Sequence, residues 1–159
     1  MIDLHSDTIY RLAGSKEPYT LLDNPFSITK EHLGKGHVGA QCFALFVHMG
    51  EISHSPWEEL NLLHDRFTEE IDKAGIPQLR DISGYDGSVK AILTTEEGAS
   101  IEGDIERLEE LKRWGVMAFG LTWNFENELG YPNSKDKAVM SSGLKRKGFE
   151  TIEACEALG

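Results

Sequence analysis

Residues 39–47 (GAQCFALFV) form a compact apolar run that is bounded by glycines on both sides. A short apolar run between turn-forming residues is typical of a strand buried in a sheet. Residues 55–74 follow as an amphipathic helix, with Ser55 and Glu58 placed as a capping box and Gly75 just past the last turn. A buried strand followed by such a helix predicts a β/α unit.

The same alternation continues on both sides of this unit. Further strands are predicted at residues 2–5, 89–93 and 116–123, and further helices at residues 104–114 and 149–158. Apolar strands joined by amphipathic helices indicate a parallel sheet covered by helices, either a doubly wound open sheet or part of a barrel. No G-x-G-x-x-G or G-x-x-x-x-G-K-[ST] turn follows any strand, which disfavours a nucleotide-binding open sheet.

The number of units favours an incomplete barrel. A TIM-type (β/α)8 barrel takes about 250 residues, and this chain has 159. We therefore expect an α/β chain whose residues 1–159 form the N-terminal half of such a barrel. This half comprises about the first four β/α units, with no second domain.

Composition excludes several classes of partner. Hydrophobic residues make up 40% of the chain and charged residues 27%, as in an ordinary globular protein. The net charge of -11 argues against binding to nucleic acid or to an anionic membrane surface. Without a signal peptide or a membrane-spanning run, we expect a cytoplasmic protein in which Cys42 and Cys155 are buried thiols.

Polar residues gather at the predicted carboxyl ends of the strands. His5 and Asp7 lie at the carboxyl end of the first strand, Glu97 lies at that of the third, and Trp123 and Asn124 close the fourth. In a barrel these ends form one mouth, where active sites lie. His5 and Asp7 are two residues apart, so both point to the same side of a strand. An imidazole and two carboxylates at one mouth predict a site for zinc or another divalent metal.

Each of these residues alone is a weak signal, because His, Asp and Glu are common in exposed loops. Their joint placement at strand ends carries the prediction. His48 follows the second strand and is the one other histidine that we predict to line the mouth.

Five segments together resemble a known family. They are residues 3–7 (DLHSD), 39–43 (GAQCF), 97–101 (EGASI), 121–127 (LTWNFEN) and 143–149 (GLKRKGF). In this order they resemble motifs of the membrane (renal) dipeptidase family, zinc metallopeptidases of family M19. The ordered set covers nearly the whole chain.

The resemblance implies a (β/α)8 barrel that holds two zinc ions and hydrolyses dipeptides with a metal-activated water. It implies that His5 and Asp7 are ligands of one zinc ion and that Glu97 bridges both. It also implies that Trp123 and Asn124 contact the substrate, although Trp123 stands where animal members carry a histidine.

The family takes two further histidine ligands, an arginine and an acid/base aspartate from segments beyond the fourth unit. We therefore assign no catalytic residue with certainty in this half, and expect it to bind at most one Zn2+ and to be inactive alone. We expect it to self-associate or to pair with the missing C-terminal half. The alternative is a non-catalytic half-barrel protein that self-associates or binds a partner chain. Another amidohydrolase-like metal hydrolase fits less well, because those barrels usually open with His-x-His.

Overall fold

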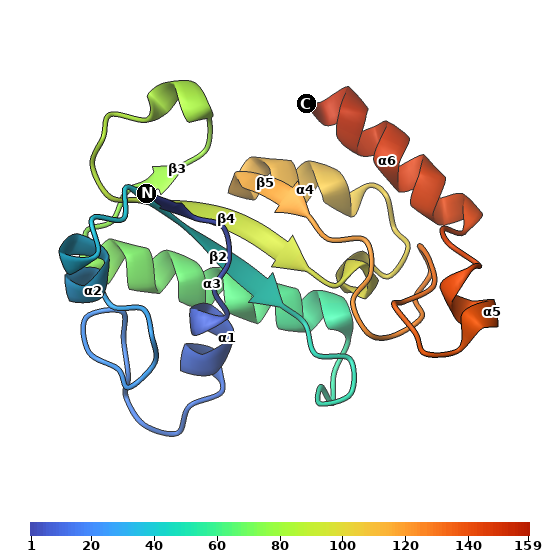
Figure 1. The fold of residues 1–159 in the computed structure, drawn as a ribbon, viewed down its shortest axis with the longest axis horizontal. Coiled ribbons are helices and arrows are strands. Elements are labelled where there is room, and N and C mark those ends of the chain that lie inside the picture. The colour runs from blue at the N-terminus through green and yellow to red at the C-terminus, as the bar shows by residue number, and fades with distance from the viewer. The chain divides into compact units, whose positions relative to one another are not determined.

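The computed structural model describes all residues, 1–159, as an α/β fold (Figure 1). The chain divides into two compact units, the first comprising Met1–Phe46 and Asn61–Thr94 and the second comprising Val47–Leu60 and Thr95–Gly159. The elements are β1 Ile2–Asp3, α1 Thr8–Ala13, α2 Lys30–Lys35, β2 Ala40–Phe46, α3 Pro56–Ala74, β3 Gln78–Leu79, η1 Ile82–Gly84, β4 Lys90–Glu96, η2 Gly98–Ile101, α4 Arg107–Trp114, β5 Val116–Phe119, α5 Lys137–Met140 and α6 Arg146–Leu158.

The first unit is built around β2, whose seven residues are all buried. β1 runs parallel to β2, with Ile2 opposite Ala40. Beyond β1 the chain stays beside β2, because the backbone N–H of Ala44 donates to the carbonyl of Ser6 at 3.0 Å. The chain around Ser6 is thereby fixed along the carboxyl half of a buried strand.

Strand order in this sheet is β1-β2-β4-β3. The hydroxyl of Thr94 on β4 donates to the carbonyl of Phe43 on β2 at 3.3 Å. β3 is parallel to β4, with Gln78 opposite Ala91. β4 continues to Glu96, three residues further than the sequence indicated, which brings the strand end up to Glu97.

The predicted β2 and α3 are confirmed. Ser55 and Glu58 form the capping box, with Glu58 N–H donating to Ser55 Oγ at 3.2 Å and Ser55 N–H donating to Glu58 Oε2 at 3.0 Å. Within the first unit, the rings of Phe43 and Phe67 pack with centroids 6.0 Å apart. Both side chains are at most 1% exposed, so this aromatic pair anchors the core of the unit.

In the second unit, α4 packs against β5 and α6. β5 pairs with β4, and the N–H of Gly120 donates to the carbonyl of Thr95 at 3.0 Å. The prediction of a strand over residues 116–123 was wrong in length, since β5 ends at Phe119. Trp123 therefore lies in an irregular segment rather than at the end of a strand.

The helix predicted at residues 149–158 begins earlier, at Arg146, and its apolar side chains are not its buried positions. Phe149 is 58% exposed, whereas the buried positions are Gly148 and Thr151. The physical reason is close approach: a Cβ at position 148 would lie 2.2 Å from the carbonyl oxygen of Leu129. The small residue, and not the aromatic one, faces the rest of the unit.

Both cysteines are free thiols, with Cys42 buried and Cys155 half-buried. Burial raises the pKa of both thiols. None of the helices combines the length and the apolar character that a bilayer span requires.

Candidate metal centre

His5 and Asp7, predicted as metal ligands, lie together in the first unit. His5 Nε2 is 3.3 Å from Asp7 Oδ1, and the backbone N–H of His5 donates to Asp3 Oδ1 at 3.3 Å. Asp7 occupies the N-cap position of α1, yet its side chain makes no capping hydrogen bond. An N-cap aspartate ordinarily uses its carboxylate for the helix N–H groups. The carboxylate of Asp7 is instead available beside the imidazole.

A cavity of about 410 Å3 lies next to this pair. Its lining includes His5, Asp7, Arg11 and Phe26. The Arg11 guanidinium lies 5.5 Å from the centroid of the Phe26 ring, a distance at which a cation is attracted to an aromatic face. The cavity therefore combines groups of the metal-ligand type, a cation and an apolar wall.

The chain between α1 and α2 supplies part of this wall and is held by a buried charge. Glu70 is fully buried; its Oε2 accepts a hydrogen bond from Leu21 N–H at 2.5 Å. Arg66 Nη2 lies 3.1 Å from Glu70 Oε1 and donates to the carbonyl of Tyr19 at 2.6 Å. The long connection is thus tied to α3 at two backbone positions.

Glu97, the third predicted ligand, is fully buried in the second unit. Its φ of 84° is in the region that side chains rarely adopt, a conformation that costs about 1–3 kcal/mol and is concentrated at functional sites. Its Oε1 accepts hydrogen bonds from Ala99 N–H at 3.0 Å and from Asn127 Nδ2 at 2.6 Å. Its Oε2 is buried without any hydrogen-bond partner.

The glycine after Glu97 is required by space. A Cβ at Gly98 would lie 2.3 Å from the carbonyl oxygen of Leu121 and 2.7 Å from Leu129 Cδ1. In this Glu-Gly pair, Glu97 carries the carboxylate on a strained backbone. Gly98 leaves the space that the neighbouring residues Leu121 and Leu129 fill.

Asn127 is a site residue whose role sequence reasoning missed. It is 6% exposed and contacts Glu97 directly. Its Oδ1 accepts from the N–H groups of Leu129 and Gly130 at 2.8 and 3.1 Å. An Asn that precedes a glycine turn by a few residues is a turn signal in the sequence, but nothing in the pattern points to its second partner.

Trp123, one of the predicted substrate contacts, belongs to an aromatic cluster in the second unit. The His48 ring lies 5.5 Å from the Trp123 ring and 5.9 Å from the Phe125 ring, measured between centroids. His48 Nδ1 accepts from Gly50 N–H at 3.2 Å. Asn124 is exposed. Phe125, which the sequence analysis did not single out, belongs to the same cluster as Trp123 and His48.

Imidazole nitrogen and carboxylate oxygen are zinc ligands. His5 and Asp7 adjoin each other in the first unit, and Glu97 offers an unsatisfied buried oxygen in the second. Donor atoms of the kinds that bind a divalent cation such as zinc are therefore present in both units.

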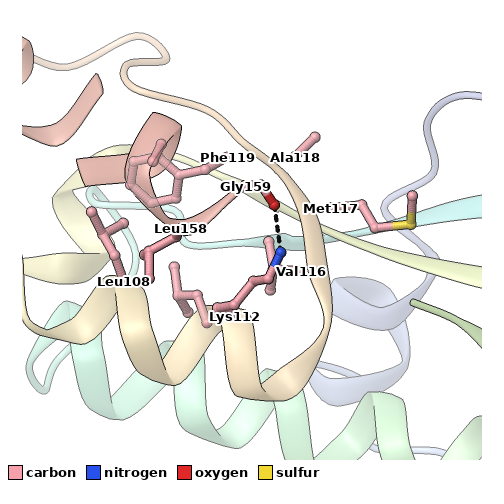
Figure 2. A pocket seen from close by; sticks show the side chains of 10 residues that line it. Leu108, Lys112, Val116, Met117, Ala118, Phe119, Leu158 and Gly159 are labelled. Atoms are coloured by element: carbon pink, nitrogen blue, oxygen red, sulfur yellow. Dashed lines mark hydrogen bonds between the residues drawn. The ribbon is translucent and has the colours of Figure 1, made fainter. Parts of the chain in front are cut away.

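A smaller cavity of about 130 Å3 opens in the second unit between α4, β5 and α6 (Figure 2). Lys112 Nζ donates to the carbonyl of Gly159 beside it. The other residues in its lining are Leu108, Leu111, Val116, Met117, Ala118, Phe119, Cys155 and Leu158. Because none of these residues carries a side-chain carboxylate or an imidazole, this cavity is no candidate for the metal centre.

The structure resembles solved structures of metallopeptidases. One is described as dipeptidase AC, a metallopeptidase of family M19, with a TM-score of 0.80 and 17% identity over 99% of this chain and 53% of that one. A metallopeptidase from Rhodobacter sphaeroides has a TM-score of 0.81 and 16% identity over 99% of this chain and 56% of its own. The probable dipeptidase PvdM from Pseudomonas aeruginosa has a TM-score of 0.71 and 15% identity over 86% of this chain and 39% of its own. No curated protein shows a significant match to the sequence.

These likenesses confirm the predicted α/β fold of the TIM-barrel type. The chain spans about half the length of these solved relatives. The model of the membrane dipeptidase family, peptidase family M19, matches residues 1–159. A match over the entire chain establishes the relationship that the ordered motifs suggested, and the chain belongs to the membrane dipeptidase family, peptidase family M19.

Proposed function

We propose that this chain contributes His5, Asp7 and Glu97 to the zinc site of a dipeptidase. The observation that carries the proposal is Glu97, which is fully buried, strained at φ 84° and left with an unpartnered Oε2. Leaving a charged oxygen buried without a partner is costly. A cation ligated by this oxygen would remove that cost.

The first unit supports the same assignment. The Asp7 carboxylate makes no helix-cap hydrogen bond and lies 3.3 Å from the His5 imidazole, so two groups of the ligand type adjoin each other. The Asp3 carboxylate accepts a hydrogen bond from the His5 backbone N–H, which steadies the chain from Asp3 to His5. When bound, zinc polarises a carbonyl group and lowers the pKa of water, so that water can attack an amide near neutral pH.

The family and the cavity support a proposal for the substrate class. One structural relative is described as liganded with a phosphinate mimic of the dipeptide L-Ala-D-Ala, and we propose dipeptides for this chain as well. The cavity of about 410 Å3 beside His5 and Asp7 falls in the range of small-molecule sites. We further propose that Trp123 and Asn124 contact the substrate, with His48 packed against the Trp123 ring.

We also propose that the chain by itself is inactive. It spans about half the length of its solved relatives, and the family resemblance implies two zinc ions in a complete site. The three ligands proposed here suffice for at most one ion. Activity would then require pairing with a segment that corresponds to the other half of the relatives.

Calorimetric titration of Zn2+ into the chain tests the proposal. We expect at most one ion per chain and a loss of at least tenfold in affinity for Glu97→Gln, which replaces a charged ligand by a neutral amide. Glu128→Gln is the matched control, because Glu128 is exposed in the same unit. Equal zinc affinity of Glu97→Gln and wild type would contradict the ligand role, and two tight sites would contradict the single-ion expectation. L-Ala-D-Ala hydrolysis by the chain alone would refute its inactivity.

A further inference from the structure

We propose that Asn127 is a positioning residue that holds the Glu97 carboxylate through Oε1 and thereby presents Oε2 to the metal ion. The inference rests on the proposed function, because it concerns how one proposed ligand is aimed. It also links the ligand to the segment that carries the proposed substrate contacts.

The side-chain amide of Asn127 has every hydrogen-bonding group engaged. Nδ2 donates to Glu97 Oε1 at 2.6 Å and to the carbonyl of Leu121 at 2.9 Å. Oδ1 accepts from the N–H groups of Leu129 and Gly130. A flipped amide would set oxygen against two oxygens and nitrogen against two N–H groups, so the orientation is determined by its partners.

The two contacts to Glu97 Oε1 come from different segments. Ala99 N–H comes from the turn that directly follows Glu97, and Nδ2 comes from a residue 30 positions away. A carboxylate held by Ala99 N–H alone can swing about that single hydrogen bond. The second donor fixes its plane, and Oε2 is left as the only buried oxygen of the group without a partner.

Asn127 also braces the segment of the aromatic cluster. Through the carbonyl of Leu121 it holds the start of the stretch on which Trp123 and Phe125 lie. One side-chain amide therefore contacts both the proposed metal ligand Glu97 and the backbone of the segment that carries the proposed substrate contact Trp123. Partners of metal ligands that act in this way typically change metal affinity by 10–100-fold when they are removed.

The test compares two variants that loosen the same segment. Asn127→Ala removes the contact to Glu97. Lys145→Met removes the Nζ hydrogen bond to the backbone carbonyl of Asn127, at 2.7 Å, and leaves the contact to Glu97 in place. Co2+ affinity and the visible absorption spectrum of bound Co2+ are measured for both variants, together with the melting temperature of the metal-free chain.

We expect Asn127→Ala to lose 10–100-fold in Co2+ affinity and to change the absorption spectrum at saturation. Lys145→Met should keep the wild-type spectrum and lose less than about threefold in affinity at a similar loss of melting temperature. Equal effects of the two variants would overturn the inference, because metal affinity would then follow the stability of the segment. If Asn127→Ala fails to fold, Asn127→Asp replaces it, since its carboxylate still accepts from Leu129 and Gly130. A wild-type spectrum for that variant would also overturn the inference.

A double-mutant cycle separates this inference from the proposed function. The melting temperatures of metal-free Asn127→Ala, Glu97→Ala and the double variant should be non-additive if Asn127 holds Glu97. A wild-type chain that binds no Co2+ would sink the proposed function, whereas additive effects in the cycle would sink the positioning role.

Discussion

Gly98→Ala adds one methyl group at the point where the chain closes on itself beside Glu97. The new Cβ would lie 2.3 Å from the carbonyl oxygen of Leu121 and 2.7 Å from Leu129 Cδ1. Real Cβ atoms essentially never approach a heavy atom within 3.0 Å, so the Leu121 carbonyl must move. That carbonyl also accepts a hydrogen bond from Asn127 at 2.9 Å, which the movement would break.

Two terms set the expected magnitude. Overpacking costs about 1–3 kcal/mol, and the loss of one hydrogen bond adds about 1 kcal/mol. At roughly 2–4 °C per kcal/mol for a chain of this size, Gly98→Ala should melt about 4–16 °C below wild type. All three tryptophans, Trp57, Trp114 and Trp123, lie in the second unit with Gly98. Thermal melting followed by tryptophan fluorescence therefore reports on the affected unit.

Gly34→Ala is the control, because the same chemical change is not expected to lower the melting temperature there. Gly34 lies in α2 and nothing stands within 4 Å of its added Cβ. Alanine in a helix is about 0.5–1 kcal/mol more favourable than glycine, so circular dichroism should show an unchanged or slightly raised melting temperature. A Gly98→Ala chain that melts with wild type would refute the close approach, and with it the geometry assigned to Glu97.

Three further outcomes are expected. Glu70→Gln should destabilise the chain by about 1–3 kcal/mol in urea unfolding, because it weakens charge-assisted hydrogen bonds at a fully buried position; a change below about 0.5 kcal/mol would contradict the anchoring role. Hydrogen bonds led by the Ser88 hydroxyl hold the pKa of Asp86 well below its usual range, so this carboxylate contributes stability above its unfolded pKa of about 4, and that contribution is lost as the pH falls further. Asp86→Asn should therefore lose less stability than wild type between pH 5 and pH 2, and parallel profiles would count against the interaction. Met117 and Phe149 are 41% and 58% exposed, and the chain spans about half the length of its solved relatives. We therefore expect light scattering to show self-association of the purified chain; a monodisperse 17.8 kDa monomer that melts cooperatively would refute that expectation.

Local patterns predicted those elements whose signals are local. The capping box at Ser55 and Glu58, and Gly75 after α3, at φ 59°, both match the sequence reasoning. The apolar run of β2 is buried at every position. Each of these features depends on residues within a few positions of one another or on burial along a single strand.

Patterns that depended on distant partners failed. The apolar run at residues 116–123 continues in the sequence, but β5 stops at Phe119. In α6 the apolar residue Phe149 is exposed, whereas the close approach to Leu129 requires the small residue Gly148 at the contact. Hydrophobicity alone does not reveal which side of an element meets another backbone.

The sequence alone determined the order of β/α units, the caps of α3, the acidic charge and the ligand-type residues His5, Asp7 and Glu97, because composition, periodicity and motif order are properties of the chain itself. Only the tertiary structure decided how those residues are held. The strained backbone of Glu97, its unpartnered Oε2 and its contact with Asn127, 30 residues away, arise from the folded chain. Hydrogen bonds between distant segments form only after packing has brought them within about 3 Å, and no local pattern encodes which segments will meet.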